Sequence, residues 1–140
     1  MENHFRVIED VIYQTRVQHN ISLYQLGRQY SIPTLYRVEK HDNYTMQILF
    51  SYLQRLGLTF TLDGATVKSQ EELGQVLRKK RIEAGESLES MHYKSGLQTK
   101  GIISIEKGRG CTKKSVNKYL DVIGNKVTIK AVNKPILNKY

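Results

Sequence analysis

The feature that most constrains this sequence is an internal repeat, because a chain built from two copies of one unit must adopt a fold that accommodates both. The first copy spans residues 11–62 and the second spans residues 77–132. Each contains an apolar-periodic segment ending in Arg (Arg16, Arg81), then a Ser (Ser22, Ser87) and a Thr (Thr45, Thr112) suited to helix N-caps. The order of features predicts four short helices in each copy.

The second helices are expected at residues 23–30 and 88–95, and the third helices share the pattern apolar-x-x-apolar-Glu-Lys at residues 35–40 and 102–107. Each fourth helix ends at a Gly, Gly57 or Gly124, which favours a helix C-terminus.

Beyond each of these glycines the period changes to two. Apolar and polar residues alternate at 58–62 and 127–131, which predicts one short strand per copy. An isolated strand leaves its backbone amides unpaired, so we expect the two strands to pair as an antiparallel ribbon. Pairing within one chain would make an intramolecular pseudo-dimer, and pairing between chains would make a homodimer.

The resulting expectation is a mainly α fold with two domains at residues 1–64 and 65–132 and a tail at 133–140. The dipeptide Asp63-Gly64 is expected to close the first strand and to begin a linker of about six residues. The linker leads to Ser69, whose spacing to Glu72 is that of a capping box.

Charge is distributed unevenly between the copies. The net charge is +9, yet residues 1–66 hold six basic and six acidic side chains, which leaves sixteen of the 22 basic and seven of the 13 acidic residues for 67–140. A basic surface favours a polyanionic partner, so we expect phosphate contacts in the second half.

Composition also excludes several classes of protein. No apolar run approaches the roughly 20 residues that cross a bilayer, and the first residues lack a secretory pattern, so a cytoplasmic location is expected. Cys111 is the single cysteine and the four histidines are scattered, so we expect no disulfide, metal or cofactor. The sequence contains no phosphate-binding loop, no nucleophile with a base at a known spacing and no paired carboxylates, so we do not expect an enzyme.

Residues 73–126 resemble the Xre helix-turn-helix family, the family of Cro and lambda repressor. The resemblance is carried by Leu77-Arg78-x-x-Arg81, Gly85-x-Ser87-Leu88-Glu89, Gly96-Leu97-Gln98 and Ile102-x-x-Ile105-Glu106-Lys107-Gly108. It implies tandem lambda-repressor-like domains that bind double-stranded DNA sequence-specifically and regulate transcription as a repressor. The strand that follows the helices also resembles HipB-type antitoxin regulators.

The same resemblance implies roles for individual residues. Gly96 is expected at positive φ in the turn before the recognition helix, which should span about residues 99–107. Base-contacting positions are Thr99, Lys100 and Ser104, and phosphate-contacting positions are Gln98, Lys107 and Arg109. We further expect Lys113 and Lys114 to bind phosphates beside the amides that begin the fourth helix. Buried ion pairs are expected between Arg81 and Glu106 and between Arg16 and Glu39.

Two features depart from the family. Gly101 lies inside the expected recognition helix and costs it about 1 kcal/mol of helix propensity. The first copy is two residues shorter, since 23 positions separate Arg16 from Glu39 and 25 separate Arg81 from Glu106. We therefore expect its third helix to start late and to be shortened, and the first copy to serve as a pairing platform rather than a DNA-contacting unit.

A protein-interaction module is the alternative function. In this interpretation the chain is the antitoxin of a toxin–antitoxin pair, and Ile136, Leu137 and Tyr140 of the tail bind the toxin. The sequence leaves this alternative open.

Overall fold

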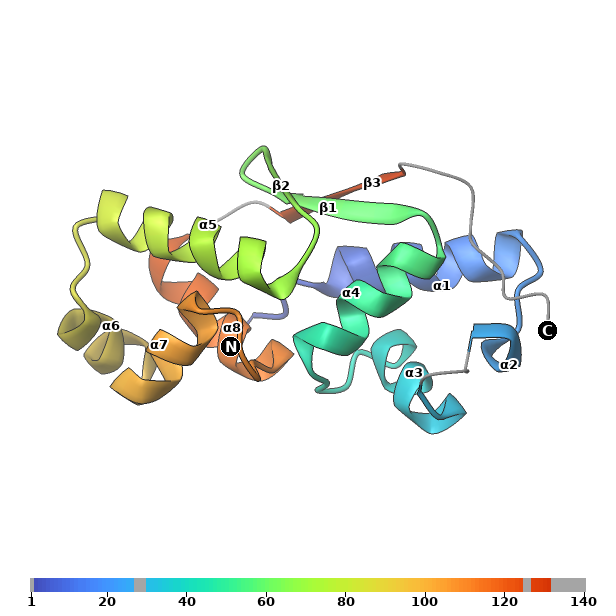
Figure 1. Cartoon of the computed structure of the whole chain (residues 1–140), viewed down its shortest axis with the longest axis horizontal. Helices are drawn as coiled ribbons and strands as arrows, with labels where there is room; N and C mark the ends of the chain where they lie inside the picture. Colours follow the sequence, from blue (N-terminus) through green and yellow to red (C-terminus); the bar gives the residue numbers. More distant parts are fainter. Residues whose placement is uncertain (1, 27–29, 125–126, 132–140) are drawn as a thin grey trace.

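A computed structural model describes residues 2–26, 30–124 and 127–131 of the chain (Figure 1). The first run of helices is α1 (Arg6–Gln18), α2 (Leu23–Leu26), α3 (Ile32–Glu39) and α4 (Met46–Arg55), followed by strands β1 (Leu58–Leu62) and β2 (Ala65–Val67). The second run is α5 (Gln70–Glu83), α6 (Leu88–Ser95), α7 (Thr99–Glu106), α8 (Lys113–Ile123) and strand β3 (Val127–Ala131). The protein is therefore mainly helical, with one small antiparallel sheet.

The strands form a three-stranded sheet in the order β2-β1-β3. Strands β1 and β3 run antiparallel within the one chain, with Leu58 opposite Ala131 and Leu62 opposite Val127. Phe60 and Ile129 form the central pair. The antiparallel pairing expected from the period-two alternation is confirmed, and it joins the end of the first helical run to the end of the second.

Strand β2 was not predicted. Asp63 and Gly64 both have positive φ, 49° and 87°, which is the backbone geometry of a tight hairpin turn. The chain consequently doubles back, and Phe60 pairs with Val67 in the register of β1 and β2. Residues 65–67 are thus a strand, where the sequence indicated only a linker.

The helix caps follow the sequence closely. Ser22 accepts a hydrogen bond from the Gln25 amide, and Ser87 accepts one from the Ser90 amide at the same position of the second run. Ser69 accepts from the Glu72 amide, as expected of its half of a capping box. Thr112 caps α8, whereas Thr45 stands at the N-cap of α4 without a side-chain cap bond.

The prediction of a shortened third helix in the first run is wrong. Helices α3 and α7 each contain eight residues. Ser31 accepts from the Thr34 amide, and Pro33 lies in the first turn, where its missing N–H has no helical partner to lose. The helix therefore begins earlier than expected, and the two-residue deletion lies ahead of Ile32. Part of the expected second helix, residues 27–29, lies outside the described residues.

One cluster of buried residues runs through both halves. Phe60 of β1 lies at its centre, with the Phe5 ring edge-on at 6.1 Å and the Phe50 ring stacked at 5.4 Å between centroids. The two halves share this core beneath the sheet. Within the described part of the chain, every helix is too short or too polar to cross a membrane.

Candidate nucleic-acid interface

Helix α7 is fixed to the second half by a buried group of three side chains. Arg81 of α5 donates from Nε to Glu106 at 2.7 Å and from Nη2 to the same carboxylate at 3.1 Å. Its Nη1 donates to the Glu86 carbonyl at 3.0 Å, and the hydroxyl of Tyr119 on α8 donates to Glu106 at 2.6 Å. These bonds hold the C-terminal end of α7 against both neighbouring helices.

In the first half, the equivalent atoms of Arg16, Glu39 and Tyr52 form the same four hydrogen bonds. Arg16 donates from Nε at 2.7 Å and from Nη2 at 2.8 Å to Glu39, and from Nη1 to the Ile21 carbonyl at 2.9 Å. Tyr52 of α4 donates to Glu39, as Tyr119 does to Glu106. The structure thus brings together both Arg–Glu pairs named from the sequence. The tyrosines were missed, although each lies 13 residues after its Glu in both copies.

The electrostatics of the two groups explain why the tyrosines act as donors. Burial and the neighbouring carboxylate of Glu106 raise the pKa of Tyr119 well above its usual value, and burial and the Glu39 carboxylate raise the pKa of Tyr52 in the same way. Each hydroxyl therefore stays protonated. The hydrogen bond to Glu106 also raises the pKa of Arg81, so the guanidinium stays charged.

Helix α7 turns one face inward and leaves another exposed. Gly96 has a φ of 77°, as expected for the sharp turn between α6 and α7, and Gln98 is the N-cap of α7. Ile102 and Ile105 are buried. The outer positions named from the sequence are exposed at Thr99, Lys100, Gln98, Lys107, Arg109 and Lys114, and half-buried at Ser104. Six of these seven side chains are therefore exposed to solvent on or beside α7.

Lys113 does not belong to this surface, which corrects the sequence interpretation. Its side chain is 5% exposed and donates to Glu9 at 2.8 Å and to the carbonyl of His41 at 2.8 Å. The ammonium also lies 4.9 Å from the centre of the Tyr44 ring. Because all of these partners lie in the first half, Lys113 joins the halves together and cannot reach a phosphate.

The amides at the start of α8 are also engaged within the protein. The Lys113 amide donates to the Tyr44 carbonyl at 2.9 Å, the Lys114 amide to Asn43 Oδ1 at 3.0 Å, and the Ser115 amide to Thr112 Oγ1 at 3.3 Å. The expected phosphate site at this helix N-terminus is therefore wrong. Only the exposed side chain of Lys114 remains available there.

An approximate two-fold relation connects the two halves. Thr45 and Thr112, which begin α4 and α8, form an isolated antiparallel bridge. Beside it the Met46 amide donates to the Cys111 carbonyl at 3.0 Å, which mirrors the bond from Lys113 to Tyr44. Figure 1 shows α3 and α7 on the same side of the molecule, opposite the sheet. The two third helices are thus arranged as a pair on one face.

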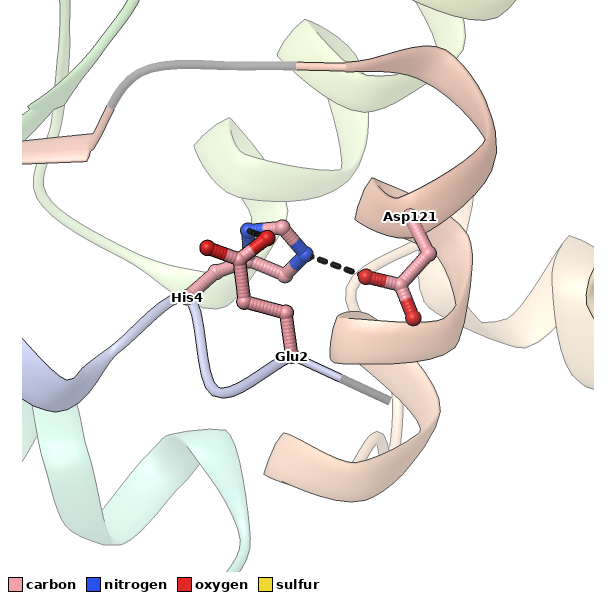
Figure 2. Close-up of side chains that lie close together, drawn as sticks. All are labelled: Glu2, His4 and Asp121. Atoms are coloured by element: carbon pink, nitrogen blue, oxygen red, sulfur yellow. Dashed lines mark hydrogen bonds and ion pairs between the residues drawn. The ribbon is translucent and has the colours of Figure 1, made fainter.

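A further cluster ties the N-terminal segment to α8 (Figure 2). His4 Nε2 lies 2.6 Å from Asp121, its Nδ1 lies 3.9 Å from Glu2, and its amide donates to Asn117 at 3.0 Å. Ligand atoms of Glu2, His4 and Asp121 lie within 4.8 Å of one another. The two carboxylates lie at opposite nitrogens of the ring, and the bond to Asp121 and the amide bond to Asn117 connect the N-terminal segment of the first half with α8 of the second.

Gly101 provides a stability test of α7. No heavy atom lies within 4 Å of the position that a Cβ would occupy there, so Gly101→Ala should raise the free energy of unfolding by about 1 kcal/mol through helix propensity. Urea denaturation followed by circular dichroism measures this change. Gly74→Ala is the matched control, since its Cβ would lie 2.4 Å from the Glu106 carbonyl and should destabilise the protein. A Gly101→Ala variant less stable than the native chain would contradict the open environment of this position.

Comparison with known proteins identifies no relative: no family model, no curated protein and no solved structure matches the chain.

Proposed function

We propose that the chain is a sequence-specific double-stranded DNA-binding regulator of the helix-turn-helix type, in which the two helical runs are tandem domains. The observation that carries this proposal is the presentation of α7, whose polar outer residues Thr99 and Lys100 are exposed while Glu106 anchors its end. A helix fixed at one end and exposed along one face suits insertion into a major groove.

The charges around α7 support the same function. Lys107 and Arg109 follow the helix directly, Lys114 lies on the next helix, and all three are exposed. Such side chains neutralise backbone phosphates and set the register of a protein on the duplex, while residues of the helix contact base edges. The regulator would act by occupying an operator in the cytoplasm, as a repressor, and would need no cofactor.

Binding to labelled duplexes at several salt concentrations tests the proposal. Arg109→Ala should weaken binding to every duplex and lower the slope of log K against log salt by about 0.9, because one phosphate contact is lost. Lys100→Ala should instead reduce the preference for the selected sequence over random sequence. Lys130→Ala is the control, since this exposed lysine lies on β3, across the molecule from α7 (Figure 1). If Arg109→Ala and Lys100→Ala both bind like the native chain and like the control, α7 is not the DNA-contacting helix.

An antitoxin or other protein-interaction role is the second candidate, and one observation favours it. Several large apolar side chains of the first half are exposed, notably Tyr24 at 81%, Tyr36 at 49% and Ile32 at 44%. Exposed aromatic residues are typical of protein interfaces. The tail residues Ile136, Leu137 and Tyr140, which were expected to contact a toxin, lie outside the described residues. A toxin partner would co-purify with the chain, and Tyr24→Ser should release it.

A further inference from the structure

The exposed side chains around α3 differ in charge and polarity from those at the equivalent positions around α7. Equivalence is set by the repeated contacts, which match Arg16 with Arg81 in the first helices, and Glu39 with Glu106 and Thr45 with Thr112 farther along the chain. Counting from the nearest anchor, five exposed pairs differ in chemistry; first half before second, they are Ile32 and Thr99, Pro33 and Lys100, Asp42 and Arg109, Gln47 and Lys114, and Tyr13 and Arg78. In each of these pairs the second half has a basic or hydroxyl side chain where the first half has one that is apolar, aromatic, amide or acidic. Two other positions do not follow this rule, because Lys40 and Lys107 are both exposed lysines and exposed Arg37 corresponds to half-buried Ser104.

The third helices and the turns that follow them have matching backbones, so the pairs there differ in their side chains. Helices α3 and α7 have equal length. The amides of Asp42 and Arg109 donate to the carbonyls of Arg37 and Ser104 respectively, each at 2.9 Å. The first half therefore presents a helix of the same form as α7 in the related position.

The first turn of α3 cannot contact base edges as the first turn of α7 can. Ile32 and Pro33 offer no side-chain donor or acceptor, whereas Thr99 and Lys100 offer both a hydroxyl and an ammonium. Asp42 would repel a phosphate at the place where Arg109 would attract one. At the C-cap of α3, the Lys40 ammonium lies 5.2 Å from the centre of the Tyr36 ring, so this cation already has an aromatic partner within the protein.

From this we infer that the DNA target of the chain is asymmetric. Base contacts are confined to the second half, so the specified sequence is a single half-site read by α7, without the inverted copy that two identical helices would require. This inference rests on the proposed function and names the kind of duplex that the same site recognises.

Selection of bound duplexes from a random library, with the full chain at one fixed salt concentration, tests the inference. We expect one uninterrupted motif, with no inverted copy at a spacing of about 10 base pairs. An enriched inverted repeat would overturn the asymmetry and leave the proposed function standing. If no motif is enriched at all, both the proposed function and the inference are overturned.

A matched pair of variants locates the base contacts. Lys100→Ala should change the selected motif and lower the affinity for it about tenfold or more. Arg37→Ala, at the exposed outer face of α3, should leave the motif unchanged. A loss of preference at any base pair in the Arg37→Ala selection would show that α3 also contacts base edges and would overturn the inference. Circular dichroism of both variants verifies that each is folded.

Discussion

Replacement of Lys113 by methionine is expected to lower the free energy of unfolding by about 3 kcal/mol or more. Its partner Glu9 is fully buried and also accepts hydrogen bonds from Asn3 at 2.9 Å, His41 at 2.7 Å and Tyr44 at 2.6 Å. Removing the ammonium leaves this carboxylate in the core without its cation. Methionine is the natural probe because Met46 fills the equivalent position of the first half and is fully buried.

Chemical denaturation of Lys113→Met, Glu9→Gln and the double variant forms a cycle that isolates the pair. The double variant should recover part of the stability lost in Lys113→Met, because the buried charge is then absent. A loss below about 0.5 kcal/mol in Lys113→Met, the range of ordinary surface changes, would contradict a buried contact between the halves.

Glu106→Gln is expected to have an effect of similar size, about 3 kcal/mol, and to abolish sequence-specific DNA binding. The amide can no longer pair with Arg81, and the donor Tyr119 loses a charged acceptor. Both changes release the end of α7 from α5 and α8. Denaturation measures the first effect, and binding to the selected duplex, at a temperature where the variant is folded, measures the second.

Glu39→Gln is the matched control for this experiment. Glu39 makes the same bonds to Arg16 and Tyr52 in the first half, so the loss of stability should be comparable. The selected motif should be retained, since α7 keeps its anchor. Equal loss of specific binding in both variants would mean that the effect comes from general destabilisation and not from the position of α7.

The helices, their caps and the ribbon could be predicted because their determinants are local. Ser22 and Ser87 bond to amides three residues away, and the period-two alternation of residues 58–62 is contained in five residues. The ion pairs span 23 and 25 residues, yet they could be expected because the family resemblance implied such a pair and the repeat places it twice at one position. Repetition supplied information that a single copy would not contain.

The errors concern contacts between the halves and fine turn geometry. Lys113 was expected at the surface because its partners, Glu9 and the His41 carbonyl, lie 104 and 72 residues earlier. No local pattern links residues at such separations. Strand β2 was missed because three residues are too few for an alternation pattern, and its pairing depends on the positive φ of Asp63. Helix α3 was expected to be short because the two missing residues of the first copy were assigned to its start, whereas the helix begins at Ile32 and keeps eight residues.

If the chain has the function proposed above, the ribbon of β1 and β3 has a consequence for how DNA binding depends on the amount of protein. Regulators assembled from separate subunits lose their active form on dilution, because association depends on subunit concentration. Here both halves reside on one polypeptide and meet at a fixed effective concentration. For a chain that binds its operator as a monomer, occupancy at low concentration is then expected to rise in proportion to the protein concentration, without the threshold that subunit assembly introduces.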